Sequence, residues 1–260
     1  MDPAHSIAGA FVGFLVGVTG VGGGSLMAPI LILLFGFNPA VAIGTDLWFA
    51  AITKTAGGII HHRLGSSDWK IVGRLALGSL PAAALTLVWL AQFHGGRLQS
   101  DLLMTLLGAA LLLVAIFILS RHRIVRPLRK LRDRMGPRMR RHQFIATVVG
   151  AMVVGCLVTL TSVGAGALVA VMLALVYPLR MNARTIVGTD IVHAIPLTLL
   201  AALGHSWLGN VDGWLLASLL LGSIPGIVAG SLLTGKINDN LVRIALGVML
   251  IASSLKMLFS

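Results

Sequence analysis

Charged residues are scarce in this sequence, at 11% of 260 residues, whereas hydrophobic residues make up 57%. A typical soluble domain has about 25% charged residues, so this composition excludes an ordinary soluble protein. Apolar runs of about 20 residues, the length that a helix needs to cross a bilayer, recur along the whole chain. The alternation typical of a membrane β-barrel is missing. The sequence therefore predicts an all-α integral membrane protein with several spans.

Cysteine occurs once, as Cys156, which excludes an internal disulfide and favours a packing role. No nucleophile–base pair, phosphate-binding loop or nucleotide fingerprint is found. We therefore expect neither an enzyme nor an ATP-driven pump, and no cofactor. The histidines show no metal-ligand spacing, so no metal site is expected. The chain also lacks the basic region of a cleaved signal peptide, so its first apolar run should stay in the mature protein.

Acidic residues are few as well: eight Asp and Glu stand against 20 Lys and Arg, for a net charge of +12. Ten of these cations lie between Arg121 and Arg141. This distribution predicts a basic cytoplasmic loop at 121–142, which can contact anionic lipid headgroups, rather than a nucleic-acid-binding protein. Residues 1–120 and 143–260 are then two transmembrane units.

Glycine, in contrast, is abundant and gathers within two long apolar segments. Residues 20–25 read Gly-Val-Gly-Gly-Gly-Ser inside segment 6–36, and residues 162–166 read Ser-Val-Gly-Ala-Gly inside segment 144–177. A straight helix over 6–36 would be roughly 46 Å long, but a hydrocarbon core is only about 30 Å thick. Each glycine also weakens a helix by about 1 kcal/mol. We expect two half-helices in each segment, meeting at a break that is buried or lines a cavity.

The half-helix that begins near Ser25 would direct unpaired N–H groups and the positive end of its dipole at the break, which favours anions. Together with nearby hydroxyls, these groups could cradle a tetrahedral oxyanion. Alternatively, the glycines only let helices pack closely and the hydroxyls only satisfy local backbone groups. The candidate substrate-binding residues are Gly22, Gly23, Gly24, Ser25, Thr45, Ser162, Gly164, Gly166 and Thr189.

The two halves repeat one another at a spacing of 144 residues. Internal repeats are typical of secondary transporters, whose binding site lies between the halves. Pro81 and Pro225 fall inside their segments and should kink them. The matching pairs are Gly-Thr-Asp at 44–46 and 188–190, Gly-Ser-Leu/Ile-Pro at 78–81 and 222–225, and Asp68 with Asp212. Each half has about four apolar segments, at 6–36, 40–60, 70–92 and 101–119, and at 144–177, 183–203, 213–234 and 240–259.

The positions of Lys and Arg predict how the halves are oriented. If all eight segments cross the membrane with the basic loop inside, 14 cations lie inside and five outside. If the two broken segments instead return to their own side, each half crosses three times, and 17 cations lie inside and two outside. The second arrangement obeys the positive-inside rule better. It predicts inverted repeats with both termini outside.

Ionisable side chains within spanning segments are costly and are candidates for function. Asp46 and Asp190 occupy the same place in both halves; they could carry protons, gate the cavity or bind a cation, or only stabilise a helix N-terminus. Lys54 lies on nearly the same helix face as Asp46 and could pair with it, attract an anion or extend to the membrane surface. His193 follows Asp190 by three residues and could relay protons or be a neutral core histidine.

The pattern Gly-x3-Gly-x2-Gly-x-Gly-Gly-Gly from Gly13, followed by Pro29, resembles the opening of TauE/SafE proteins. The resemblance covers nearly the whole chain. It implies transport of small sulfur-containing anions, such as sulfite, sulfoacetate or related sulfonates, across a bacterial cytoplasmic membrane. Further matching motifs are Ala42–Thr45, His62–Gly65 with Asp68 and Trp69, Val187–Thr189 and Gly209–Asp212.

The chain departs from the family pattern at Asp46 and Asp190, where members commonly carry a small polar residue, and at Ser162 and Ala165, which replace glycines. An added carboxylate would repel an anion unless it were protonated or paired, which favours proton coupling or another substrate. We therefore expect a secondary transporter that holds an anion between the breaks, with rocking of the repeats alternating access. A membrane scaffold that docks a partner or lipid through the basic loop and an anion channel are the alternatives.

Overall fold

The computed structural model describes residues 3–19, 23–63, 67–96, 98–132, 139–177, 181, 183–233 and 239–259. These ranges contain ten α-helices and no strand, so the predicted all-helical class is confirmed. The helices are α1 (Pro3–Thr19), α2 (Met27–Leu33), α3 (Pro39–Arg63), α4 (Trp69–His94), α5 (Ser100–Arg132), α6 (Met139–Thr161), α7 (Ala167–Val176), α8 (Ala183–Trp207), α9 (Gly213–Leu233) and α10 (Asp239–Leu258).

Six stretches of the described helices are long and apolar enough to cross a membrane. The surface of the molecule agrees with a bilayer environment, because large apolar side chains such as Leu85 and Phe93 are exposed. Trp69, Trp207 and Trp214 are also exposed at helix ends, where tryptophan is enriched at membrane interfaces. The six stretches are Trp69–His94, Ser100–Ser120, His142–Thr161, Arg184–Trp207, Gly213–Gly230 and Leu241–Leu258.

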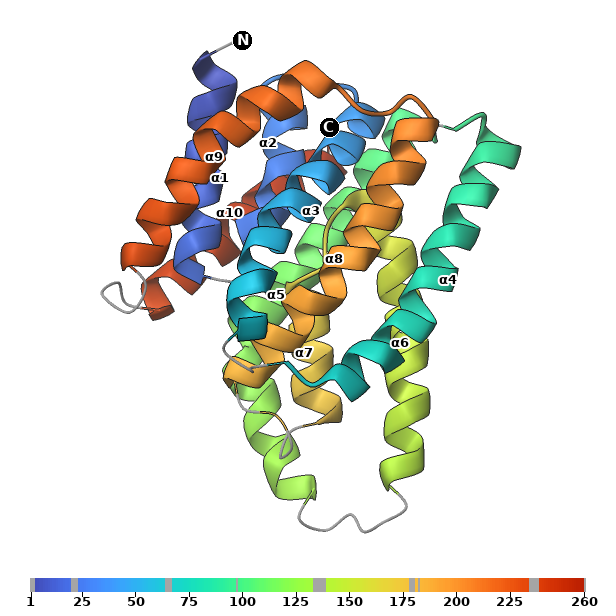
Figure 1. Ribbon diagram of the computed structural model, residues 1–260, viewed down its shortest axis with the longest axis vertical. Coiled ribbons are helices and arrows are strands. Elements are labelled where there is room, and N and C mark those ends of the chain that lie inside the picture. The colour runs from blue at the N-terminus through green and yellow to red at the C-terminus, as the bar shows by residue number, and fades with distance from the viewer. Residues whose placement is uncertain are drawn as a thin grey trace.

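Both long apolar segments are broken where the glycines predicted a break. In the first segment α1 ends at Thr19, and a 3-10 turn over Gly23–Leu26 leads into α2. In the second, α6 ends at Thr161 and α7 begins only at Ala167. Figure 1 shows that α2 runs in the direction opposite to α1, and that α7 runs in the direction opposite to α6. Each broken segment therefore forms a hairpin of two helices.

The two hairpins start from opposite ends of the molecule. Figure 1 places the start of α1 and the end of α10 at one end, and the end of α5 and the start of α6 at the other. After the first hairpin, α3, α4 and α5 alternate in direction, and after the second hairpin α8, α9 and α10 do the same. The chain thus enters each half from a different end.

The basic segment is mostly helical, which corrects the expectation of a loop over 121–142. Helix α5 continues to Arg132, and α6 begins at Met139. Arginine, lysine and leucine are good helix formers, so a helix that leaves the apolar region can continue through such residues. Residues 133–138, which lie between the two helices in the sequence, are outside the described ranges.

Helices of the two halves pack against each other in reciprocal pairs: α1 against α9, and α4 against α6. A Cβ added at Gly13 of α1 would lie 2.5 Å from the Ser223 carbonyl oxygen of α9, and one added at Gly155 of α6 would lie 2.4 Å from that of Ser79 in α4. Such distances leave no room for a side chain, so glycine permits the close contact. Pro81 and Pro225 lie inside α4 and α9, as expected, and Figure 1 shows α4 bending along its length.

At the centre, α3 packs against α8 in the opposite direction, and this pair carries most of the predicted site residues. The start of α3 meets the end of α8, where Trp48 Nε1 donates a hydrogen bond to Ser206 Oγ over 2.7 Å. The central pair is therefore flanked by helices of both halves and positions the site inside the molecule.

Candidate functional site

Polar side chains that are almost fully buried line the central pair of helices. Thr45 and Asp46 of α3 and Thr189, Asp190 and His193 of α8 each have 1% or less of their surface exposed. Burying an ionisable side chain inside a membrane protein is costly, so such residues mark candidate functional positions. These five side chains therefore face the interior of the molecule, and the roles predicted for them stay predictions.

Asp46 lies between the two helix breaks. Its carboxylate is near the Ser162 hydroxyl, which opens the second break, and near the backbone N–H of Ala28, just after the first break. Neither contact meets hydrogen-bond geometry, and both carboxylate oxygens and the Ser162 hydroxyl lack a hydrogen-bond partner in the described part of the chain. Asp46, the aspartate of the first Gly-Thr-Asp motif, is thus close to residues of both breaks.

Lys54 connects α3 to the second break. Its ammonium group donates a hydrogen bond to the backbone carbonyl oxygen of Ala165, and it interacts electrostatically with the carboxylates of Asp190 and Asp46. Eight residues separate Asp46 from Lys54 along α3, which corresponds to about 12 Å of helix. With both carboxylates ionised and the lysine protonated, these three residues carry one net negative charge.

His193 links α8 to α4, because its Nε2 lies 2.8 Å from the hydroxyl oxygen of Ser79. Its other ring nitrogen, Nδ1, has no hydrogen-bond partner among the described residues, and neither has Asp190 Oδ1. Most buried polar atoms in proteins are paired, so unpaired ones that gather in one place need an explanation. We define the central cluster as Asp46, Lys54, Ser162, Asp190 and His193; it has the groups needed to bind a small polar solute or a proton.

Thr45 and Thr189 form matching contacts between the halves. The Thr45 hydroxyl accepts a hydrogen bond of 3.1 Å from the backbone N–H of Asp212, and the Thr189 hydroxyl accepts one of 3.0 Å from that of Asp68. Both threonines remain substrate-binding candidates, since a hydroxyl that accepts a hydrogen bond can still donate one. The structure adds a positioning contact that the sequence did not indicate.

The sequence also did not assign a role to Asp68 and Asp212 beyond their matched spacing. Asp68 Oδ1 accepts hydrogen bonds from the backbone N–H groups of Lys70 and Ile71, and so caps α4. Asp212 Oδ1 accepts from those of Trp214 and Leu215, and so caps α9. An aspartate just before an apolar helical run is a known N-cap pattern and could have predicted this.

The remaining predicted residues lie in or beside the breaks. Gly23, Gly24 and Ser25 belong to the 3-10 turn before α2, where Ser25 is buried, whereas Gly22 lies outside the described residues. Gly164 has φ +104°, in the left-handed region that favours glycine, and Gly166 directly precedes α7. Among the described break residues, Ser162 and the carbonyl group of Ala165 lie close to ionisable side chains.

Comparison with known proteins agrees with this architecture. Residues 6–257 match the family described as Sulfite exporter TauE/SafE. The chain is 40% identical over 259 residues to a Bacillus subtilis protein named probable membrane transporter protein YjnA, which covers 99% of this chain and 100% of that protein. It is 29% identical over 229 residues to YdhB of the same species, named likewise, with 86% of each chain covered.

A protein of Methanocaldococcus jannaschii, also named a probable membrane transporter protein, is 26% identical over 261 residues, which cover 95% of this chain and 90% of that one. No solved structure matches the chain. Because the family match extends over nearly its whole length and six helical stretches are suited to cross a bilayer, the chain belongs to the TauE/SafE family and is a multi-pass membrane protein.

Proposed function

We propose that this protein is a secondary transporter of small sulfur-containing anions, such as sulfite, sulfoacetate or other organosulfonates, in the bacterial cytoplasmic membrane. The description of its family as a sulfite exporter supports the substrate class, and the names of its relatives support transport. One observation carries the proposal: Lys54 and the Asp46 carboxylate lie beside the helix breaks, and the Asp190 carboxylate interacts electrostatically with Lys54.

An inverted arrangement of the two halves would allow alternating access through this cluster. The contact of Gly13 with Ser223 has its counterpart in that of Gly155 with Ser79, and the two threonine hydroxyls bind the helix caps of opposite halves. The halves also begin at opposite ends of the molecule (Figure 1). In transporters with inverted repeats, one repeat rocks against the other around a site near the midplane. In the proposed mechanism, the central cluster would be this site.

The charges of the cluster favour joint binding of an anion and a proton. Lys54 attracts an anion, and the unpaired Ser162 hydroxyl can donate to one of its oxygens. Two ionised carboxylates would repel the same anion in a site of low dielectric. Protonation of Asp46 or Asp190 removes this repulsion, so the anion and the proton move in the same direction.

Solute flux into proteoliposomes that contain the purified protein tests the proposal. We expect saturable uptake of sulfite or sulfoacetate, little uptake of a carboxylate of similar size, and none in protein-free vesicles. Lys54→Gln should lower the flux at least tenfold, which equals about 1.4 kcal/mol of lost transition-state stabilisation. Lys256→Gln is a matched control, because it removes an exposed cation far along the chain from the cluster. Absence of flux for every sulfur anion would overturn the proposal.

A further inference from the structure

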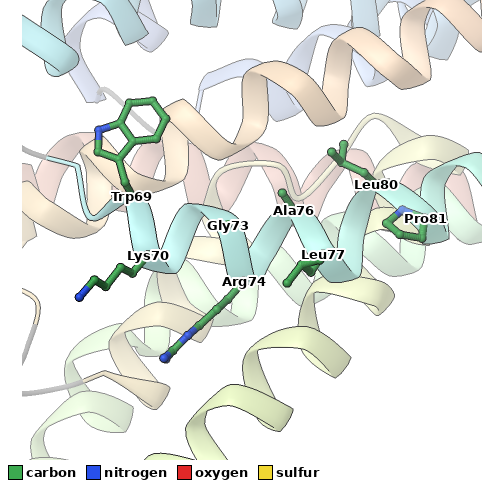
Figure 2. A pocket seen from close by; sticks show the side chains of 8 residues that line it. All are labelled: Trp69, Lys70, Gly73, Arg74, Ala76, Leu77, Leu80 and Pro81. Carbon is green, nitrogen blue, oxygen red and sulfur yellow. The ribbon is translucent and has the colours of Figure 1, made fainter.

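The outer face of α4 carries a hollow with a volume of about 740 Å³ that is separate from the central cluster. Gly73 lies in the middle of its lining, and a Cβ added there would meet no atom within 4 Å. Trp69 and Leu77 are 58% and 63% exposed, so the hollow opens to the surroundings of the protein. Figure 2 shows its lining residues, which are Trp69, Lys70, Gly73, Arg74, Ala76, Leu77, Leu80 and Pro81.

Two cations lie at one end of this hollow. Lys70 and Arg74 are one helical turn apart, and Figure 2 shows both side chains extending to the same side of α4. Arg74 is held in place, because its Nη1 donates a hydrogen bond of 3.1 Å to Tyr177 Oη and its guanidinium carbon lies 5.6 Å from the centre of the Phe144 ring. Neither cation forms an ion pair with a carboxylate of the described chain, and the nearby Asp68 carboxylate caps α4.

The other end of the hollow is apolar. Ala76, Leu77, Leu80 and Pro81 follow the cations along α4, in the direction that leads into the membrane. Helix α4 begins toward the end of the molecule where α5 ends and α6 begins (Figure 1), and the basic residues there mark that end as cytoplasmic. Trp69, at the first position of the helix, suits the interface between headgroups and acyl chains. The hollow therefore has the polarity profile of a phospholipid.

We propose that this hollow binds an anionic phospholipid of the cytoplasmic leaflet, with its phosphate between Lys70 and Arg74 and an acyl chain lying across Gly73 along Leu77 and Leu80. Charge complementarity selects this occupant, because the hollow offers two cations that form no ion pair with a described carboxylate, and anionic lipids concentrate in that leaflet. The proposal is independent of the transported substrate.

The second half lacks the same lipid site. The positions that match Lys70 and Arg74, 144 residues later, are Trp214 and Ser218. Neither residue carries a charge, and the Ser218 hydroxyl donates to the Trp214 carbonyl oxygen within α9. The proposed lipid therefore binds on one side of the membrane only.

Native mass spectrometry of the full-length protein in detergent tests this proposal, with phosphatidylglycerol and phosphatidylcholine supplied at equal concentration. The wild type should retain phosphatidylglycerol in preference to phosphatidylcholine. Lys70→Gln should lower bound phosphatidylglycerol about fivefold, the effect of ~1 kcal/mol per basic residue at an anionic surface. Gly73→Leu should lower binding of the lipid by filling the hollow, while both cations remain.

Two matched variants control for the loss of a cation and for the added side chain. Lys256→Gln removes an exposed cation elsewhere, and Gly213→Leu adds a side chain at another glycine with no atom within 4 Å of the added Cβ. Both should retain phosphatidylglycerol like the wild type. Size-exclusion chromatography verifies folding, and Gly73→Leu keeps the test decisive if loss of a cation prevents folding. Equal retention of both lipids by the wild type, or wild-type retention by Gly73→Leu, would overturn the proposal.

Discussion

Ser162 combines a strained backbone with a hydroxyl at the centre of the site. Its φ of +57° lies in the left-handed region that glycine adopts without penalty, and its hydroxyl faces Asp46. A residue with a Cβ costs about 1–2 kcal/mol in this conformation. The role in transport that we propose for the hydroxyl would explain why serine rather than glycine stands at this position.

Two substitutions distinguish the role of the Ser162 hydroxyl in flux from the effect of the backbone conformation on stability. We expect Ser162→Gly to be more stable than Ser162→Ala by about 1 kcal/mol, because only glycine relieves the left-handed strain. Both variants should lose anion flux, because both lack the hydroxyl. Thermal unfolding and proteoliposome flux measure the two effects. Wild-type flux in Ser162→Gly would show that the hydroxyl has no role.

The contributions of the Lys54 and Asp190 charges to the stability of the protein should depend on each other. Lys54 interacts electrostatically with Asp190, so removing either charge leaves the other less compensated in a site of low dielectric and is destabilising. We therefore expect Lys54→Gln and Asp190→Asn each to lower the unfolding temperature, and the double variant to be more stable than the sum of the single effects predicts. A double-mutant cycle measures this coupling. Strictly additive effects would mean that the two groups do not interact.

At the scale of the elements, the caps of α4 and α9 hold the two halves together. Each cap binds a threonine of the other half: Asp68 binds Thr189, and Asp212 binds Thr45. These contacts fix where α4 and α9 begin relative to the central pair α3 and α8. If the halves rock, these two hydrogen bonds must either persist or be replaced by others.

Thr45→Val and Thr189→Val should lower stability by similar amounts, about 1 kcal/mol each, since each leaves a backbone N–H of a cap without its acceptor. Thermal unfolding of the purified variants measures the effect. Thr105→Val is the matched control, because the exposed Thr105 hydroxyl bonds only within its own helix and its loss should change little. A large effect in one threonine variant and none in the other would contradict the reciprocal arrangement.

The breaks within the elements could be predicted, whereas the contacts across them could not. The length of segment 6–36 and its glycines indicate a break directly. The bond from Lys54 to Ala165 joins residues 111 apart, and no local pattern reports such a pairing. The helix up to Arg132 was missed because its charge was taken to indicate a loop, although arginine and leucine favour helix.

On the scale of the whole molecule, the sequence predicted the membrane class because the scarcity of charged residues and the lengths of the apolar runs are properties of the chain itself. The pairing of α1 with α9 and of α4 with α6 could not be read from it, because each contact joins different halves. The central cluster needs both halves too: Asp46 and Lys54 come from one, and Ser162, Asp190 and His193 from the other. In the proposed mechanism, movement of one half against the other would change the access to a site divided in this way.

The most direct test of this account is the response of anion efflux to a pH gradient in proteoliposomes loaded with sulfoacetate. A pH difference of about one unit supplies ~1.4 kcal/mol per coupled proton. If the anion leaves together with a proton, efflux through the wild type should accelerate when the interior is acidic and slow when it is alkaline. The double variant Asp46→Asn/Asp190→Asn should still exchange anion but ignore the gradient. A double variant that responds to the gradient like the wild type would contradict the claim that these two carboxylates couple protons to the anion.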